Sequence, residues 1–365
     1  MSFKDAIKRL LYLPARLRWR RGGVQLPLDP SSVRSILILR YDAIGDMIVT
    51  TPLFDALRSV VPDAAIDVVA SNRNAGLLAD DDRIRHVHVY DGSRSAFRAV
   101  RKACRRQRYD VVISLVMNKT TKAGLMANRL GGSKAITVSF ENAARRDLYA
   151  TWFDVQVPVE RNVSAMAEMQ LRIVEALFGV RCDPASFPMR IRLDAANERF
   201  AAQQVRGNEG HHTIGFNLSA GNPYRMWSEE RNAEFLTLLM AVDADTHIVL
   251  FSDGARRDMA LRLASMDPSR ISCCEPTKDF RSVVATLGRM DVVITPDTSV
   301  VHAAAAMGTP VVVMYSLKAS FLVEWQPFGV PHRVAYTNGR EDLETLEPAE
   351  VLQAYMELMS VRSGR

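Results

Sequence analysis

Three kinds of feature are missing from this 365-residue chain, and each absence narrows its class. No run of about 18 apolar residues occurs, so we expect no membrane-spanning helix. The N-terminus lacks the apolar stretch and cleavage site of a secretory signal. The four cysteines form no CxxC pair, so we expect reduced thiols in a cytoplasmic protein and no cysteine metal site.

Common cofactor fingerprints are also absent. Gly45 stands alone where a GxGxxG dinucleotide motif needs three glycines, and no Walker A, HExxH or GxSxG pattern occurs. The acidic runs Asp80-Asp81-Asp82 and Asp243-Ala244-Asp245 resemble a DxD metal motif, but surface turns are the expected interpretation. We therefore predict no cofactor and no bound metal.

The positive charge of the chain is concentrated at one end. The formal net charge is +6, and the first 21 residues hold one acid, Asp5, against the basic residues Lys4, Lys8, Arg9, Arg16, Arg18, Arg20 and Arg21. Because the remaining chain is near neutral, a nucleic-acid-binding surface is not expected. Residues 1–30 are predicted to be a basic amphipathic extension, whose residues 3–21 either contact an anionic membrane surface or pack on the domain.

Strand and helix patterns alternate along the rest of the chain. A length of 365 residues exceeds most single cores, so two domains are expected. Short apolar runs predict strands at 35–40, 66–70, 86–89, 111–115 and 135–138, with helices at 46–60 and 94–107. After a linking region at 181–212, strands are predicted at 212–217, 247–251, 271–274, 292–294 and 311–314.

This alternation predicts an α/β fold of two Rossmann-like lobes with parallel sheets, at 31–190 and 205–345. A cleft between two such lobes is a preferred place for a ligand. The segment 346–365 holds a helical pattern at about 348–360, which we expect to brace the first lobe.

Two carboxylates follow the first predicted strand. They are Asp42 and Asp46 in the run Arg40-Tyr41-Asp42-Ala43-Ile44-Gly45-Asp46. The carboxyl end of a parallel strand is where open α/β folds bind ligands. A carboxylate there either caps the next helix or takes a proton from a hydroxyl, and the spacing alone favours the cap.

Two turns in the second half of the chain are suited to an anion. Asp297, Thr298 and Ser299 are N-cap types between the strand at 292–294 and an Ala-rich helix, whose free N–H groups favour a phosphate. Ser219, Ala220 and Gly221 are small enough for backbone N–H groups to reach an anion. Arg225 follows and can neutralise phosphate charge, unless this is a surface turn with a solvated arginine and a packing Trp227.

These three segments together resemble glycosyltransferase family 9, the ADP-heptose:lipopolysaccharide heptosyltransferases, over about residues 33–330. The resemblance rests on Arg40-x-Asp42-x-Ile44-Gly45-Asp46, on Ser219-Ala220-Gly221 with Arg225-x-Trp227, and on the run from Asp297 to Pro310. It implies a GT-B fold of two facing lobes, and sugar transfer with inversion and without a metal.

The resemblance also implies roles for particular residues. Asp46 matches the proposed general base, and Asp297, Thr298 and Ser299 match positions that hold the donor's diphosphate and sugar. Arg225 falls where a basic residue faces the diphosphate, in the turn of Ser219, Ala220 and Gly221. His302 either touches the donor or packs the helix.

For the acceptor, the resemblance implies an anionic lipid-linked core sugar at the cytoplasmic side of an inner membrane. Asp42, Lys119 and Lys122 are the candidate contacts. Ser114-Leu115-Val116 and Tyr315-Ser316 depart from the family pattern. The alternatives are a family 9 enzyme with another sugar nucleotide or a non-lipid acceptor, and a non-catalytic protein that binds a nucleotide sugar.

Overall fold

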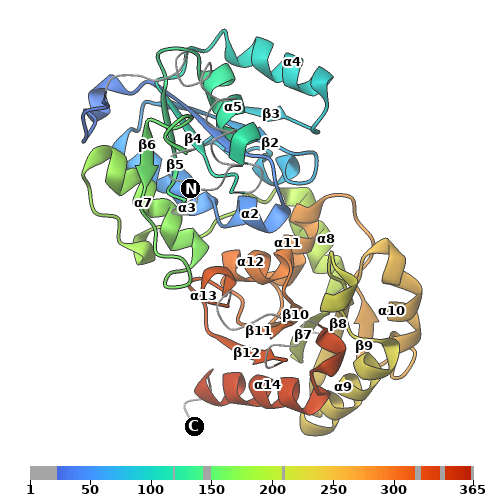
Figure 1. Ribbon diagram of the computed structural model, residues 1–365. Helices are drawn as coiled ribbons and strands as arrows, with labels where there is room; N and C mark the ends of the chain where they lie inside the picture. Colours follow the sequence, from blue (N-terminus) through green and yellow to red (C-terminus); the bar gives the residue numbers. More distant parts are fainter. Residues whose placement is uncertain are drawn as a thin grey trace, which may run out of the picture. The chain divides into compact units, whose positions relative to one another are not determined.

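The computed structural model describes residues 23–117, 120–142, 149–207, 210–316, 322–337 and 342–362. The chain divides into two compact units (Figure 1). The first unit comprises Met1–Arg161 and Ala167–Phe187, and the second comprises Asn162–Met166 and Pro188–Arg365. The predicted membrane segment at 3–21 and the predicted acceptor contact Lys119 lie outside the described residues.

The first unit is built on a six-stranded sheet in the order β3-β2-β1-β4-β5-β6. All the strand pairs are parallel. The strands are β1 (Ser35–Arg40), β2 (Ala65–Ala70), β3 (His86–Val89), β4 (Val111–Ser114), β5 (Ile136–Phe140) and β6 (Val155–Val157). Every residue of β1 is buried, as expected for a central strand covered on both faces.

The second unit repeats this arrangement, with the sheet order β12-β11-β10-β7-β8-β9. Its parallel strands are β7 (His212–Asn217), β8 (Thr246–Phe251), β9 (Ile271–Cys273), β10 (Val292–Pro296), β11 (Val311–Tyr315) and β12 (His332–Tyr336). Counted from the first strand of each unit, both sheets have the order 3-2-1-4-5-6, which is that of dinucleotide-binding folds. The predicted α/β fold of two Rossmann-like lobes with parallel sheets is confirmed.

Helices connect the strands on both faces of each sheet (Figure 1). In the first unit they are α2 (Ile44–Ile48), α3 (Thr51–Val60), α4 (Arg94–Cys104), α5 (Thr120–Gly131) and α7 (Met166–Phe178), with short 3-10 turns at Pro30–Ser32, Ala75–Leu78 and Pro184–Ser186. In the second unit they are α8 (Ala195–Gln204), α9 (Glu229–Val242), α10 (Arg257–Ala264), α11 (Phe280–Leu287), α12 (Ser299–Ala306), α13 (Leu322–Trp325) and α14 (Pro348–Arg362), with 3-10 turns at Pro223–Arg225, Gly254–Arg256 and Leu343–Thr345.

The helix predicted at 46–60 is wrong in one respect, because it is two helices, α2 and α3. Pro52 has no N–H with which to bond the carbonyl of Ile48. The Thr51 hydroxyl donates to that carbonyl instead, at 2.8 Å, and the Thr50 hydroxyl donates to the carbonyl of Asp46 at 2.7 Å. These side-chain bonds end α2 early and leave Asp46 in a short separate helix.

The last helix belongs to the second unit. Helix α14 packs against α9, β11 and β12 of that unit. Trp227 helps to close the same core, because its indole N–H donates to the carbonyls of Leu343 and Leu346, at 3.0 and 3.1 Å. Trp227 is therefore the packing residue that one interpretation of its turn predicted. Among the described residues, no helix combines the length and apolarity needed to cross a bilayer.

Candidate functional site

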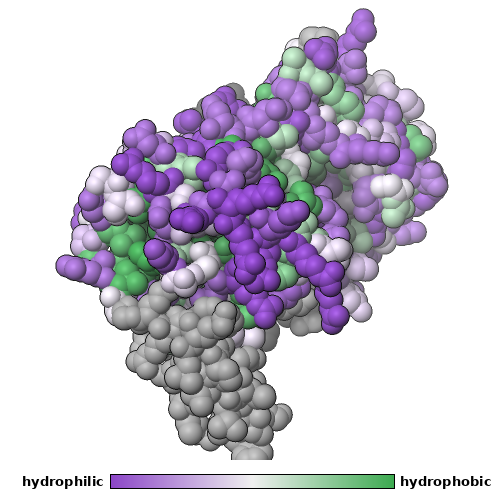
Figure 2. Space-filling view, turned by 90° about the horizontal axis from the view of Figure 1, so that it is seen from above, coloured by the Kyte–Doolittle hydropathy of each residue, from purple (hydrophilic) through white to green (hydrophobic). Residues whose placement is uncertain are grey.

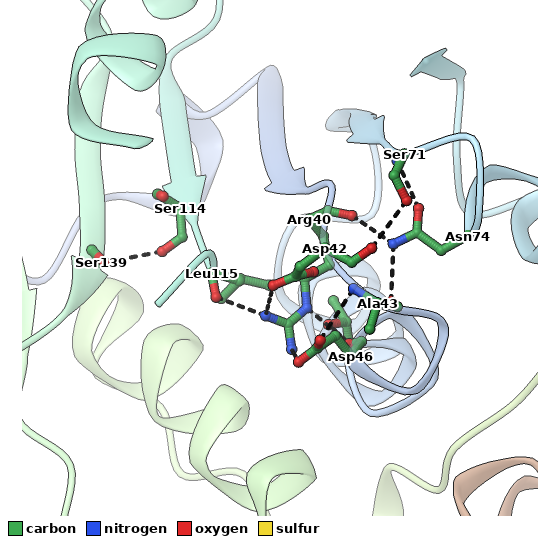
Figure 3. Close-up of polar contacts among 10 residues, drawn as sticks. Arg40, Asp42, Ala43, Asp46, Ser71, Asn74, Ser114, Leu115 and Ser139 are labelled. Atoms are coloured by element: carbon green, nitrogen blue, oxygen red, sulfur yellow. Dashed lines mark hydrogen bonds and ion pairs between the residues drawn. The ribbon is translucent and has the colours of Figure 1, made fainter. Parts of the chain in front are cut away.

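Asp46 lies just beyond the carboxyl end of β1, in the first turn of α2. One carboxylate oxygen accepts from the N–H of Ala43 at 3.2 Å. The other accepts from Nη2 of Arg40 at 3.1 Å (Figure 3). A carboxylate at a helix N-terminus is also favoured by the helix dipole. Asp46 caps α2, and 21% of its side-chain surface is nevertheless exposed. The structure is therefore compatible with both interpretations of this carboxylate, as a helix cap and as a base.

Arg40 occupies the centre of this group. It ends β1 and is 2% exposed. Its Nη1 donates to the carbonyl of Leu115 at 2.7 Å and to Asp42 at 3.2 Å. Leu115 directly follows β4, so the guanidinium bridges the ends of two neighbouring strands. In the sheet order this is the point where the strand sequence reverses, the usual ligand position of such folds.

Two residues that the sequence analysis did not select hold the same turn. The amide of Asn74 is fully buried and donates to the carbonyls of Arg40 and Ala43, at 3.0 and 3.1 Å. The hydroxyl of Ser71 donates to the carbonyl of Asp42 at 3.1 Å (Figure 3). Ser71 directly follows β2, the neighbour of β1, and a polar side chain directly after a buried strand was the available signal for it. Asn74 lies further along the same loop, where that signal does not reach.

Asp42 has an unusual protonation equilibrium. Burial raises the pKa of its carboxyl to about 6, the Arg40 guanidinium opposes that rise, and the neighbouring Asp46 adds to it. Its Oδ1 is buried without a hydrogen-bond partner. The Asp42 carboxyl is therefore not suited to hold a permanent negative charge, and it is suited to hydrogen-bond a hydroxyl group.

Asp42→Asn is expected to remove a pH dependence of stability. The pKa is higher in the folded chain, about 6, than the ordinary 3.8, so the proton stabilises the fold below about pH 4 and this stabilisation is lost as the pH rises through about 6. Relative to that of Asp42→Asn, the free energy of unfolding of the parent should fall by about 1–3 kcal/mol between pH 4 and pH 7.5. Urea denaturation of both proteins at the two pH values measures these free energies. The prediction is contradicted if the parent and Asp42→Asn differ in unfolding free energy by the same amount at both pH values.

The corresponding strand end in the second unit carries Asn217, the last residue of β7. Its amide group donates to the hydroxyl of Thr295 in β10 at 2.9 Å and to the carbonyl of Ser219 at 3.0 Å. Its Oδ1 accepts from the N–H of Ser219 at 3.1 Å. Asn217 is 4% exposed and also approaches the Thr298 hydroxyl at 3.4 Å. One buried amide thus joins the two turns that the sequence analysis proposed for an anion.

Thr298 is the N-cap of α12. Its hydroxyl accepts from the N–H of Val300 at 3.1 Å, and its backbone is extended. The sequence analysis named Asp297, Thr298 and Ser299 as N-cap types without choosing among them, and the structure selects the middle one. Ser299 begins the helix, so its N–H belongs to the first turn, whose amides lack helical partners.

Asp297 pairs with Arg225. Nη1 of Arg225 lies 2.8 Å from the Asp297 carboxylate and donates to the Asp297 carbonyl at 3.3 Å. Burial raises the pKa of the Asp297 carboxyl, and the Arg225 guanidinium opposes the rise. The Arg225 side chain is 34% exposed, so its remaining N–H groups can meet an anion from solvent. The structure brings together the arginine, the helix N-terminus and the Ser219 turn.

The other predicted donor residues differ in how well they are placed. Ser219 accepts from the N–H of Asp253 at 2.8 Å and, like Ala220, is partly exposed. A Cβ added to Gly221 would meet no atom within 4 Å, so the unliganded turn does not itself require glycine. His302 is 4% exposed and packs near Trp325, with ring centroids 5.9 Å apart.

Asn217→Ala is expected to weaken about tenfold the binding of ADP, the nucleotide of the donor that the sequence resemblance predicts. The substitution leaves the Thr295 hydroxyl and the Ser219 backbone without their buried partner, a loss of about 1–3 kcal/mol shared between stability and ligand geometry. Titration calorimetry with ADP measures the effect. Asn197→Ala is the matched control, because that buried amide joins α8 to Asp279 and Ser282 at 3.0 Å, away from both turns. Equal ADP affinity in the two variants would contradict the role of Asn217.

Lys122 lies in α5 of the first unit, and its ammonium stands 5.0 Å from the centroid of the Tyr90 ring. It lines a cavity of about 370 Å³ between α4 and α5 whose other basic residues are Arg94, Arg98 and Arg129. None of these four cations forms an ion pair within the part of the chain that the structure describes. Figure 2 looks down on the face that carries α4, where hydrophilic side chains crowd around smaller hydrophobic areas.

The two DxD-like runs are occupied by protein contacts. Asp81 is paired with Arg83 at 2.6 Å, and Asp243 with His212 at 3.2 Å and with the Tyr355 hydroxyl at 3.1 Å. Within the described ranges, no group of three or more histidine, cysteine or acidic residues is arranged to hold a metal ion.

Two Rossmann-like units of identical strand order make up a GT-B fold. The chain belongs to glycosyltransferase family 9 (heptosyltransferase), whose sequence profile matches residues 97–347. That span contains Lys122, Arg225 and Asp297, whereas Asp42 and Asp46 precede it.

Individual relatives agree with this assignment. The chain is 22% identical to lipopolysaccharide heptosyltransferase 3 of Escherichia coli over 305 residues, which cover 78% of this chain and 83% of that protein. The crystal structure of a family 9 glycosyltransferase from Veillonella parvula has a TM-score of 0.74 at 18% identity, over 93% of this chain and 99% of that one. The E. coli heptosyltransferase WaaC with ADP-2-deoxy-2-fluoro heptose has a TM-score of 0.70 at 19% identity, over 88% and 99%. At these identities the structures establish the fold alone.

Proposed function

We propose that this glycosyltransferase moves a heptose from ADP-heptose to a sugar of a lipopolysaccharide core, with inversion and with Asp46 as general base. The main supporting observation is that Arg225 forms an ion pair with Asp297, directly before the N-terminus of α12, inside a family 9 domain. The donor is inferred from the relatives, because WaaC was solved with an ADP-heptose analogue and the curated relative is a lipopolysaccharide heptosyltransferase.

The proposed chemistry is a single displacement at the anomeric carbon. Asp46 takes the proton of the acceptor hydroxyl as its oxygen bonds to that carbon, and the bond from the carbon to the β-phosphate oxygen breaks. ADP departs with the bonding electrons. Arg225 and the N-terminus of α12 stabilise the charge that develops on the diphosphate, so transfer is proposed to need no bound metal.

For the acceptor we propose contacts from Asp42, Lys119 and Lys122. The support is the cavity between α4 and α5, where Lys122 and three arginines provide positive charge beside the apolar Phe97 and Leu125. Phosphate and carboxylate groups of a lipid-linked core sugar would pair with such cations. Asp42, mostly protonated below about pH 6, is suited to hydrogen-bonding a sugar hydroxyl.

We also propose that the enzyme works at the cytoplasmic face of the inner membrane. The support is the sequence of residues 3–21, where basic side chains accompany helically spaced apolar ones. Such a segment is attracted to anionic lipid headgroups and buries its apolar face at the interface.

The test is transfer by the purified full chain with ADP-heptose and a series of lipopolysaccharides truncated at successive core sugars. We expect one truncated form to gain a heptose, seen by mass spectrometry, with inverted configuration seen by NMR. Other nucleotide sugars serve as the donor panel, and chelator is added in parallel.

Each part of the proposal has its own contradicting result. Transfer only from a different nucleotide sugar would reject the donor. Transfer only to a glycan without lipid would reject the acceptor. This part of the test matters most, because Ser114-Leu115-Val116 departs from the family pattern. Loss of activity with chelator, restored by a divalent metal, would reject metal independence.

A further inference from the structure

Arg40 is a buried charge whose partners indicate what it is for. Its side chain is 2% exposed at the end of β1. Burying a guanidinium is costly unless its N–H groups and its charge are met by partners. The partners in this chain are two carboxylates and two carbonyls, all at the carboxyl edge of the sheet (Figure 3).

Two of these four bonds go to one residue. Nε of Arg40 donates to the backbone carbonyl of Asp46 at 2.8 Å, and Nη2 donates to the Asp46 carboxylate at 3.1 Å. The first bond holds the backbone of α2 at Asp46, and the second fixes how the carboxylate is turned. Since the Ala43 N–H holds the other carboxylate oxygen at 3.2 Å, the Asp46 side chain is restrained at both oxygens.

The remaining bonds tie this restraint to the sheet. Nη1 donates to the Leu115 carbonyl after β4 and to Asp42, at 2.7 and 3.2 Å. A guanidinium can do this because its five donors lie in one rigid plane. Lysine would supply the charge but would not span the same partners.

We propose that Arg40 is the positioning residue of Asp46, holding its carboxylate at the strand-reversal point in the orientation that receives the acceptor proton. The inference rests on the proposed function, in which Asp46 is the base. In this role Arg40 acts on the reaction through the Asp46 carboxylate. A general base must sit within hydrogen-bond reach of its proton, and a displacement of about 1 Å can cost about 100-fold in rate.

The test uses Arg40→Lys and Arg40→Gln in the full chain. We expect kcat to fall about 10- to 100-fold in Arg40→Lys and further in Arg40→Gln. The donor KM and the ADP dissociation constant should stay within about twofold, because the proposed donor residues belong to the second unit. Thermal unfolding reports the stability of each variant.

Arg58→Lys is the matched control. Arg58 is another arginine of the first unit that donates to several backbone carbonyls, those of Pro62, Ala64 and Arg83, without touching Asp42 or Asp46. Arg58→Lys should lose about as much stability as Arg40→Lys, and it should keep the kcat of the parent. Parent-like kcat in Arg40→Lys, equal losses of kcat in Arg40→Lys and Arg58→Lys, or failure of both Arg40 variants to fold would each overturn the proposal.

Asp46→Asn, assayed alongside, separates this inference from the proposed function. Parent-like turnover by Asp46→Asn rejects the base and with it the positioning role. An inactive Asp46→Asn together with an unimpaired Arg40→Lys rejects the positioning role alone.

Discussion

Asp46→Asn is expected to lower kcat by about 10²- to 10⁴-fold, the usual contribution of a positioned general base. The amide keeps the size of the side chain and can still accept a hydrogen bond from Arg40, but it cannot take up a proton. The donor KM and the affinity for ADP should be unchanged, because Asp46 belongs to the first unit and the predicted diphosphate residues to the second. Steady-state kinetics with saturating acceptor, together with ADP calorimetry, measures both quantities.

Asp55→Asn is the control for Asp46→Asn. Asp55 is an aspartate of comparable exposure, 25% against 21%, and it too is paired with an arginine, Arg83, at 2.8 Å. It lies in α3, and its loss should affect stability without lowering kcat. Turnover by Asp46→Asn close to that of the parent would mean that the carboxylate only caps α2.

Arg225→Ala is expected to weaken ADP binding about 10- to 100-fold. A hydrogen bond between charged groups contributes about 1.5–3 kcal/mol, and here the lost cation also leaves the mostly buried Asp297 carboxylate without its partner. The ADP affinity of Arg225→Lys should lie between those of the parent and of Arg225→Ala, because lysine keeps the charge and loses the planar set of donors. Calorimetry with ADP at low and high salt measures the affinity and its electrostatic share.

Arg262→Ala is the control for Arg225→Ala. Arg262 also forms an ion pair in the second unit, with Glu229 at 2.7 Å, but its side chain is 60% exposed and lies on α10. Such a surface pair contributes little to stability, so ADP affinity should match the parent. An unchanged calorimetric affinity in Arg225→Ala would show that the diphosphate is held elsewhere.

The central strands could be predicted because they are buried on both faces. Runs such as Ile36 to Leu39 and Val292 to Ile294 are fully buried and read as continuous apolar segments. The strands β6 and β12 were not predicted. They are the last strands at one edge of each sheet, and β12 is mostly only partly buried, so it carries no apolar run.

The residue types of the candidate site could also be predicted, but their partners could not. N-cap chemistry selected the Asp297–Ser299 turn, and the position of Asp46 after a strand suggested a carboxylate at the sheet edge. The pairing of Arg225 with Asp297 joins residues 72 positions apart, and that of Asn217 with Thr295 joins residues 78 apart. No local pattern encodes such a distance, because it depends on which strands become neighbours.

The sequence by itself determined the alternation of strands and helices, the two-lobed α/β class and the polar residues at the strand ends, since these follow from local periodicity and capping. Only the tertiary structure decided that β1 lies beside β4 and β7 beside β10. That strand order places Arg40 against Leu115 and Asn217 against Thr295, so in each unit one buried side chain crosses the point where the order reverses. The physical reason is that each buried side chain has more donors than nearby sequence satisfies, so the acceptors at Leu115 and Thr295 had to come from the neighbouring strand.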